Sequence, residues 1–224
     1  MHRYLVTGTD TDVGKTRVVT SLALALRNRG LRPTIVKLVQ TGAGEGEEGD
    51  AQRAGVLTGL PYLELARFFK PADPWSAALA EGMPPVHAED LKRVLDRIEG
   101  AVIAEGSGGV AVPLNRQQSF ADIARLARLE AIVAVGLRLG CISHALLTVS
   151  RLQEHDVPIA GALLVERWNP TEEHFREDVT RALADKLRVL GTLRFEVDEA
   201  RSIEEGAKLF ESMISEKNSG ASPH

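Results

Sequence analysis

Cysteine is nearly absent from this chain of 224 residues, whose one cysteine is Cys141. A single cysteine cannot form an internal disulfide or a cysteine-based zinc cluster, and it is typical of a protein from a reducing compartment. The chain also lacks a run of about 18 apolar residues, the length that spans a membrane. Its N-terminus has no basic-then-apolar signal region. The sequence therefore predicts a cytoplasmic protein without a membrane segment.

A strong charge of either sign is lacking too. The formal net charge is −4, and the 27 lysines and arginines are scattered without a basic run. This pattern argues against nucleic acid as a partner. The six histidines are dispersed without metal-ligand spacing, so no zinc site is predicted. The chain has neither a Gly-x-Ser-x-Gly nucleophile elbow nor a Gly-x-Gly-x-x-Gly dinucleotide fingerprint in its first turn, which argues against those two enzyme classes.

The most informative stretch that is present is a glycine-rich loop near the N-terminus. A buried strand is predicted at Tyr4–Val6 and a helix at Gly14–Asn28, with the loop from Gly8 to Thr16 between them. Backbone N–H groups of such a loop and the N-terminus of the next helix bind phosphate oxygens. Lys15 would reach the β- and γ-phosphates, and the Thr16 hydroxyl would bind Mg²⁺. Five residues, rather than the usual four, separate the two glycines, but the strand and helix around them support a phosphate loop.

Strands and helices alternate through the rest of the chain. Apolar runs predict strands at 33–39, 101–105, 131–136, 158–165 and within 189–195, and helical spacing predicts helices at 51–57, 77–81, 87–98, 120–129, 140–155, 172–187 and 203–214. Residues 59–85 are otherwise interpreted as a packed loop, often a binding lid. This order predicts a P-loop NTPase-type α/β fold, doubly wound, with a mainly parallel sheet flanked by helices. One domain would cover residues 1–216, and residues 217–224 would be a disordered tail.

Lys37 interrupts the apolar pattern of the strand predicted at 33–39. Strands of parallel sheets are normally continuous apolar runs, so a lysine near the carboxyl end of one needs a reason. It is either an edge-strand lysine with its head in water or a residue of the crevice at the strand ends, where open α/β sheets bind ligands.

Two acidic residues are candidates for a metal site. Asp50 follows a flexible acidic loop and opens a predicted helix, so it is either the helix N-cap or a residue near the metal. Glu105 closes the strand at 101–105, directly before three glycines in four residues. In phosphate-loop enzymes an acidic residue at that place is the usual partner of Mg²⁺. The alternative, a solvated strand-end glutamate, is less favoured beside a phosphate loop.

Three further residues are interpreted as structural. Cys141 begins a predicted helix, a position that lowers the pKa of a thiol, but a small buried residue is the favoured interpretation. Trp75 and Trp168 lie beside prolines and are interpreted as loop anchors rather than as a platform for a nucleobase.

Several stretches together resemble the dethiobiotin synthetase family. The two most specific are Gly8-Thr-Asp-Thr-Asp-Val-Gly-Lys-Thr16 and Glu105-Gly-Ser-Gly-Gly-Val-Ala-Val-Pro-Leu114, and the others are residues 37–42, 49–51, 74–78 and 140–148. The resemblance implies an ATP-dependent ligase that acts on 7,8-diaminopelargonic acid. One amine takes up CO₂ as a carbamate, ATP phosphorylates the carbamate, and the second amine displaces phosphate to close a cyclic urea.

The resemblance also implies roles for particular residues. Nucleotide contacts would come from Gly8, Asp12, Val13, Gly14, Lys15, Thr16, Glu105 and Gly108, and Mg²⁺ would be held by Thr16, Asp50 and Glu105. Catalysis would depend on Thr11, Lys15 and Lys37, and the substrate would contact Lys37, Thr41, Gly140, Cys141 and Ser143. The family is homodimeric, with its substrate along the subunit interface. Two lysines, a magnesium ion and a helix N-terminus suit a reaction that brings two anions together.

The chain departs from the family at several positions. Leu38 replaces a common proline, and Ser143 replaces a frequent asparagine. The strand that ends at Val165 usually ends in an asparagine that reads adenine. We therefore predict loose discrimination among nucleoside triphosphates, with similar turnover rates and KM values for ATP, CTP and GTP; a strong preference for ATP would contradict this.

Three alternatives stay open at the level of sequence. An amidating synthase of cobalamin synthesis carries an additional glutaminase domain with a nucleophilic cysteine, whereas this chain has only Cys141. A partition-type switch ATPase carries a signature lysine where this chain has Asp10. A relative that binds nucleotide but has lost catalysis is distinguished only by activity.

Overall fold

The computed structural model describes residues 2–218 and contains a seven-stranded sheet in the order β4-β2-β6-β1-β7-β8-β9. All neighbouring strands in it are parallel. The strands of this sheet are β1 (Arg3–Gly8), β2 (Thr34–Lys37), β4 (Tyr62–Glu64), β6 (Val102–Gly109), β7 (Glu130–Gly136), β8 (Ile159–Val165) and β9 (Val189–Leu193). A small parallel pair, β3 (Gln40–Thr41) and β5 (Arg67–Phe68), lies beside it. The predicted doubly wound parallel fold is confirmed.

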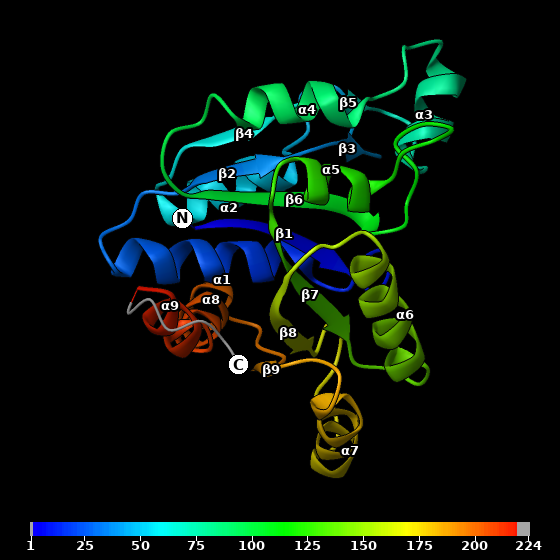
Figure 1. The fold of residues 1–224 in the computed structure, drawn as a ribbon. Coiled ribbons are helices and arrows are strands. Elements are labelled where there is room, and N and C mark those ends of the chain that lie inside the picture. Colours follow the sequence, from blue (N-terminus) through cyan, green and yellow to red (C-terminus); the bar gives the residue numbers. More distant parts are fainter. Residues whose placement is uncertain (1, 219–224) are drawn as a thin grey trace.

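Helices cover both faces of the sheet (Figure 1). They are α1 (Lys15–Asn28), α2 (Asp50–Thr58), α3 (Pro74–Glu81), α4 (Ala88–Leu95), α5 (Phe120–Leu126), α6 (Cys141–Glu154), α7 (Glu173–Ala184), α8 (Glu199–Lys208) and α9 (Glu211–Asn218). One apolar core lies between the sheet and the group α1, α2 and α9, and a second lies between the sheet and α4 to α7. No helix within residues 2–218 is long and apolar enough to cross a membrane.

The central strand β1 shows why helices must cover both faces of the sheet. Tyr4, Leu5 and Val6 are completely buried, with Leu5 facing one core and its two neighbours facing the other. Side chains alternate across a strand, so a continuous apolar run requires apolar cover on both faces. β1 therefore lies in the middle of the sheet, and its carboxyl end opens into the glycine-rich loop.

Several predicted helices and strands end two or three residues too late, and three predicted elements differ more strongly from the structure. The strand predicted to end at Glu105 continues to Gly109, because β6 stays paired with β1 as far as the Gly8–Gly109 register. The helix predicted at 203–214 is two helices, α8 and α9. The segment 59–85 contains β4, β5 and α3 rather than one long loop, and α3 begins at Pro74 with Asp73 as its N-cap.

The predicted disordered tail, residues 217–224, begins too early, because Lys217 and Asn218 belong to α9. α9 reaches Asn218. The remaining residues of the predicted disordered tail, 219–224, lie outside the described part of the chain.

Candidate active site

The glycine-rich loop wraps tightly between β1 and α1. A Cβ atom at Gly8 would lie 2.7 Å from the Asp10 carbonyl oxygen and from Val13 Cγ2, so no larger residue fits there. Gly14 has φ +91°, a left-handed conformation that favours glycine. Lys15 Nζ donates to the Asp10 carbonyl at 3.0 Å, across the loop. α1 begins at Lys15, so the predicted order of strand, phosphate loop and helix is present.

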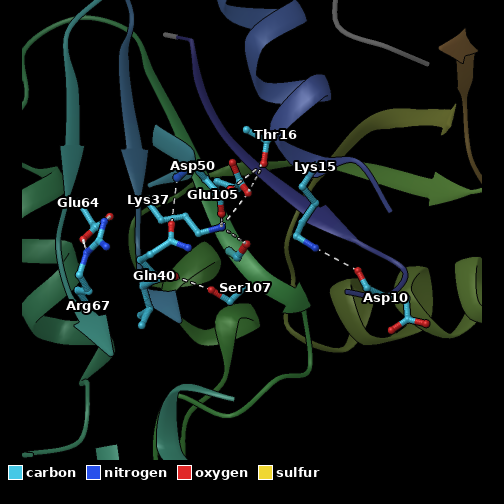
Figure 2. A network of polar contacts seen from close by, with 12 residues as sticks. Asp10, Lys15, Thr16, Lys37, Gln40, Asp50, Glu64, Arg67, Glu105 and Ser107 are labelled. Carbon is cyan, nitrogen blue, oxygen red and sulfur yellow. Dashed lines mark hydrogen bonds and ion pairs between the residues drawn. The ribbon is translucent and has the colours of Figure 1, made fainter. Parts of the chain in front are cut away.

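Four side chains meet beside this loop, where the carboxyl end of β2 pairs with the middle of β6 (Figure 2). Lys37 Nζ lies 2.6 Å from Asp50 Oδ2 and 2.7 Å from Glu105 Oε1. Thr16 Oγ1 donates to Asp50 Oδ1 at 3.2 Å and to Glu105 Oε1 at 3.3 Å. Lys37 and Glu105 are 3% and 1% exposed. One ammonium and one hydroxyl thus connect two carboxylates that come from different elements.

This geometry decides between the alternatives for each residue. β2 lies between β4 and β6, so Lys37 is not an edge-strand lysine. Asp50 is not the N-cap of α2, because Gly49 holds that place and the carboxylate of Asp50 instead pairs with Lys37. Glu105 is buried, which excludes the solvated strand-end interpretation. All three side chains point into one polar cluster.

The cluster holds more negative charge than Lys37 compensates. Burial lowers the pKa of Lys37, but Glu105 and Asp50 outweigh it, so the pKa is raised above its ordinary value. Burial raises the pKa of Asp50, yet Lys37 and Thr16 bring it below the usual value. Burial raises the pKa of Glu105, and the charge of Asp50 adds to the shift although Lys37 opposes it. Lys15 also lowers the pKa of Glu105, so cations are stabilised beside this carboxylate.

The donor set fits a magnesium ion. Glu105 Oε2 is buried and has no hydrogen-bond partner, although buried carboxylate oxygens are almost always paired. Mg²⁺ prefers oxygen ligands and keeps several positions for water or phosphate oxygens. Thr16, Asp50 and Glu105 supply three oxygen-bearing side chains there. No group of three or more histidine, cysteine or acidic residues that could hold a metal occurs within residues 2–218, so phosphate oxygens and water would complete the coordination.

A cleft of about 810 Å³ runs along the loop and the cluster. Its walls include most of the predicted site residues: Thr11, Asp12, Gly14, Lys15, Thr16, Lys37, Thr41, Asp50, Glu105 and Gly108. Residues that are distant in the sequence thus surround one space that is large enough for a nucleotide and a small substrate.

Comparison with known proteins identifies the family. A family model described as an AAA domain matches residues 2–199. The ATP-dependent dethiobiotin synthetase BioD of Anaeromyxobacter dehalogenans (strain 2CP-C) is 37% identical over 179 residues, which cover 77% of this chain and 80% of that protein. The synthetase of the same name from Aliivibrio fischeri (strain MJ11) is 34% identical over 195 residues, covering 82% and 85% of the two chains. The chain belongs to the dethiobiotin synthetase family.

Solved structures support the fold of this dethiobiotin synthetase family member. A plasmid partition protein from Borrelia burgdorferi B31 bound to AMPPNP matches with a TM-score of 0.62 at 12% identity, over 98% of this chain and all of that one. Cobyrinic acid a,c-diamide synthase from Mycobacterium smegmatis matches with a TM-score of 0.60 at 22% identity, over 98% and 96%. At these identities the likeness concerns the fold alone.

Some residues predicted from dethiobiotin synthetase motifs lie away from the cleft. Gly8 and Val13 pack against each other within the loop, and Val13 is buried. Gly140, Cys141 and Ser143 lie at the start of α6 and do not line the cleft. Cys141 is 2% exposed, as its structural interpretation requires.

The two tryptophans differ from the prediction of loop anchors. Trp75 lies in α3. Trp168 is 63% exposed, so it anchors nothing by burial. Instead, the guanidinium carbon of Arg167 lies 4.1 Å from the centroid of a Trp168 ring.

Sequence reasoning missed four groups of the site. Gln40 Oε1 accepts from the Asp50 backbone N–H at 3.1 Å and so orients the start of α2. Arg138 pairs with Asp10 at 2.5 Å, and Arg167 pairs with Asp12 at 2.9 Å. Arg53 pairs with Glu199 at 2.8 Å at the mouth of the cleft. Each arginine lies far along the chain from its acidic partner, so the spacing of residues in the sequence could not predict these pairs. The available hint was that Asp10 and Asp12 lie in a phosphate-binding loop, where their negative charge requires cations nearby.

Proposed function

We propose that this protein is an ATP-dependent dethiobiotin synthetase, which closes the ureido ring of dethiobiotin from 7,8-diaminopelargonic acid, CO₂ and ATP. The observation that carries the proposal is the cluster of Thr16, Lys37, Asp50 and Glu105 beside the phosphate loop. The named relatives support the same activity. ADP and phosphate would be the other products.

The reaction would proceed through a phosphorylated carbamate. One substrate amine attacks CO₂, and the resulting carbamate oxygen attacks the γ-phosphorus of ATP, whose bond to the β-phosphate oxygen breaks. The second amine then attacks the carbonyl carbon and phosphate leaves. Both nucleophiles belong to the substrate. This route needs no nucleophilic side chain of the protein.

The task of the protein is to hold two anions together. Lys15 and the loop N–H groups would bind the phosphates, and Lys37 would approach the carbamate from the end of β2, with Thr11 and Thr41 on either side. Holding the carbamate against the γ-phosphate removes at most about 7–11 kcal/mol of the barrier on the scale of intramolecular reactions. Mg²⁺ held by Thr16, Asp50 and Glu105 would neutralise charge on the β- and γ-phosphate oxygens.

A homodimer would supply the missing part of the substrate site. Gly140, Cys141 and Ser143 lie outside the cleft of their own chain, yet the N-terminus of α6 suits a carboxylate. Leu139 and Leu147 beside them are 86% and 66% exposed. Leu139 lies in the turn before α6 and Leu147 lies on α6, and exposed apolar side chains of this size support contact with a second copy of the chain. We therefore place the substrate carboxylate on the α6 N-terminus of the partner subunit.

The switch-ATPase alternative is less well supported. The position of its signature lysine is Asp10, which pairs with Arg138 of the same chain. An aspartate that is neutralised by an arginine of the same chain thus stands where that class carries a lysine.

A single assay tests the proposal. Purified protein is incubated with diaminopelargonate, bicarbonate, Mg²⁺ and ATP, and dethiobiotin is measured by mass spectrometry. Lys37→Gln should depress turnover while nucleotide binding stays largely intact, and Glu105→Gln should weaken the dependence on Mg²⁺. Nucleotide binding by the wild-type protein without dethiobiotin would refute the function, and an unchanged kcat in Lys37→Gln would refute the role of that lysine.

A further inference from the structure

The cleft has a second part that the chemistry above does not use. We call it the outer arm; it is lined by Arg17, Arg53, Leu57, Arg167, Glu199 and Ile203. Arg167 follows β8, which lies on the other side of β1 from β2 and Lys37, and Glu199 and Ile203 come from α8. Arg53 and Leu57 of α2 line the arm from the side of β2 and β4. In a phosphate loop the loop lysine, here Lys15, and the metal contact the β- and γ-phosphates, and the metal ligands Asp50 and Glu105 proposed here lie beside Lys37. A nucleotide whose γ-phosphate faces Lys37 therefore has its ribose and base in the outer arm.

Side chains at the end of β8 are not free to read the edge of a base. Val165 is fully buried, and its Cγ1 would lie 2.9 Å from a Cβ on Gly14, so it packs under the loop. The next residue, Glu166, is 2% exposed. Its Oε1 accepts from the Thr171 N–H at 3.0 Å and from Arg176 at 2.7 Å, and its Oε2 accepts from the Phe195 N–H at 2.9 Å.

Backbone carbonyls at this edge are also engaged. Arg17 donates to the carbonyl oxygens of Glu166 and Arg194, both at 2.9 Å. A base that enters the outer arm thus meets carbonyl and carboxylate oxygens that already accept hydrogen bonds. The ends of β8 and β9 therefore offer few free groups that could form hydrogen bonds with the edge of a base.

Arg167 offers a flat surface instead. Its guanidinium lies over Trp168, and Asp12 Oδ1 accepts from both Nε at 3.2 Å and Nη2 at 2.9 Å, which fixes the plane. Arg167 and Trp168 line a second hollow of about 740 Å³, whereas only Arg167 also lines the cleft. The guanidinium therefore separates Trp168 from the outer arm.

We propose that the nucleobase stacks on the Arg167 guanidinium in the outer arm, with Trp168 behind it, so that the base is held by its face rather than by its edge. The inference rests on the proposed nucleotide site. Planar guanidinium groups and aromatic rings stack with any base, because every base has a π-face. This supplies a physical cause for loose discrimination among nucleoside triphosphates and gives the exposed Trp168 a role.

Binding measurements with and without a base test the proposal. Affinities for ATP, GTP, CTP and inorganic tripolyphosphate, all with Mg²⁺, are measured by calorimetry for the wild type, Arg167→Lys and Trp168→Ala. Arg167→Lys keeps the charge and loses the plane. We expect it to weaken nucleotide binding roughly 5- to 100-fold, the range of one base stack, and purines more than CTP. Tripolyphosphate binding should stay within about twofold of the wild type.

The same experiment distinguishes stacking of the base on Arg167 from a role of Arg167 in holding the phosphate loop through Asp12. If Arg167 acts only by holding Asp12, its variants will weaken tripolyphosphate and ATP equally, and the proposal is overturned. Unchanged ATP binding in both variants overturns it as well. Thermal unfolding of each variant checks that the fold is intact.

A fluorescence signal provides a second readout with a matched control. In Trp75→Phe, Trp168 is the remaining tryptophan, and its emission should change with ATP but not with tripolyphosphate. The reciprocal variant Trp168→Phe should lose this response. Neither measurement needs diaminopelargonate, so base stacking without dethiobiotin formation would refute the proposed function and leave this inference standing.

Discussion

Lys37 is the residue on which the site depends, because its ammonium lies between two carboxylates from other elements. A buried ion pair is weak evidence for stability, but removal of one partner leaves an uncompensated charge. The same two carboxylates are the proposed metal ligands. Lys37 and the metal would thus share Asp50 and Glu105 as partners. The role of Lys37 can therefore be tested by stability and Mg²⁺ measurements without substrate.

We predict that Lys37→Met lowers the free energy of unfolding by about 3–5 kcal/mol without divalent cations, since Glu105 loses its buried counter-charge. Added Mg²⁺ should restore more stability in this variant than in the wild type. Urea unfolding with and without Mg²⁺ measures both effects. Lys92→Met, which removes a surface pair with Asp96, is the control and should cost less than about 1 kcal/mol. Equal Mg²⁺ effects in wild type and Lys37→Met would contradict a shared site.

Asp50 gives the site a dependence on pH. Its pKa in the folded protein lies below the usual value of 3.8, so the folded state favours the carboxylate and gains stability above that pH. As the pH falls through the lowered pKa, this contribution is lost. The difference in unfolding free energy between wild type and Asp50→Asn should therefore be constant near neutrality and shrink below about pH 4. Urea unfolding between pH 7 and pH 3 measures it; a difference that grows on acidification would show that Asp50 is not held as a carboxylate.

At the scale of elements, α2 carries Asp50 to the cluster and must be positioned accurately. Gly49 and Gly55 allow its close approach to β4: a Cβ on Gly55 would lie 2.3 Å from Tyr62 Cδ1 and 3.0 Å from Tyr62 Cβ. Gln40 holds the first N–H of the helix. The packing of α2 against β4 thus determines where Asp50 lies.

We predict that Gly55→Ala weakens Mg²⁺ binding although it touches no metal ligand, because α2 must move away from Tyr62. The overpacking should cost about 1–3 kcal/mol of stability. Calorimetry with Mg²⁺ and a non-hydrolysable ATP analogue measures the affinity. Tyr62→Ala in the same chain should restore it, and Gln52→Ala, on the exposed side of α2, should leave it unchanged. No rescue by Tyr62→Ala would show that Gly55 acts in another way.

At the scale of the whole molecule, the parallel sheet brings the ends of β1, β2 and β6 together at one edge, where the cleft forms. The start of α6 follows β7, on the far side of β1 from β2, and its residues do not line that cleft. In the proposed homodimer, the start of α6 from a second copy of the chain would complete the site.

A complementation experiment tests this requirement. Lys37→Gln removes the cleft lysine, and Ser143→Glu places a negative charge where the substrate carboxylate is proposed to bind. Each variant alone should be nearly inactive. In an equimolar mixture of dissociated and reassociated subunits, half of the dimers are mixed and each has one intact site, so activity should return to about a quarter of the wild-type value. If each site lies within one subunit, the mixture will stay inactive.

Much of the fold could be predicted because local rules and global topology agree. Buried strands such as β1, β7 and β8 are continuous apolar runs, and the loop at Gly8 to Thr16 needs its glycines for purely local steric reasons. The errors fell where tertiary pairing overrides local preference: the glycines of β6 stay in a strand because β1 lies beside them. Strands such as β4 and β5 are too short to show the alternation of apolar and polar residues that predicts a strand.

By itself the sequence determined the phosphate loop, the alternation of strands and helices, and the family to which the chain belongs, because each depends on residues that are neighbours in the chain or on motifs in a fixed order. Only the tertiary structure decided where the side chains of Lys37, Asp50 and Glu105 lie, since each had a structural alternative that burial and distance removed. It also paired Arg138 and Arg167 with the aspartates of the loop. Charges that are distant in sequence compensate one another only once the sheet has brought their strand ends to the same edge.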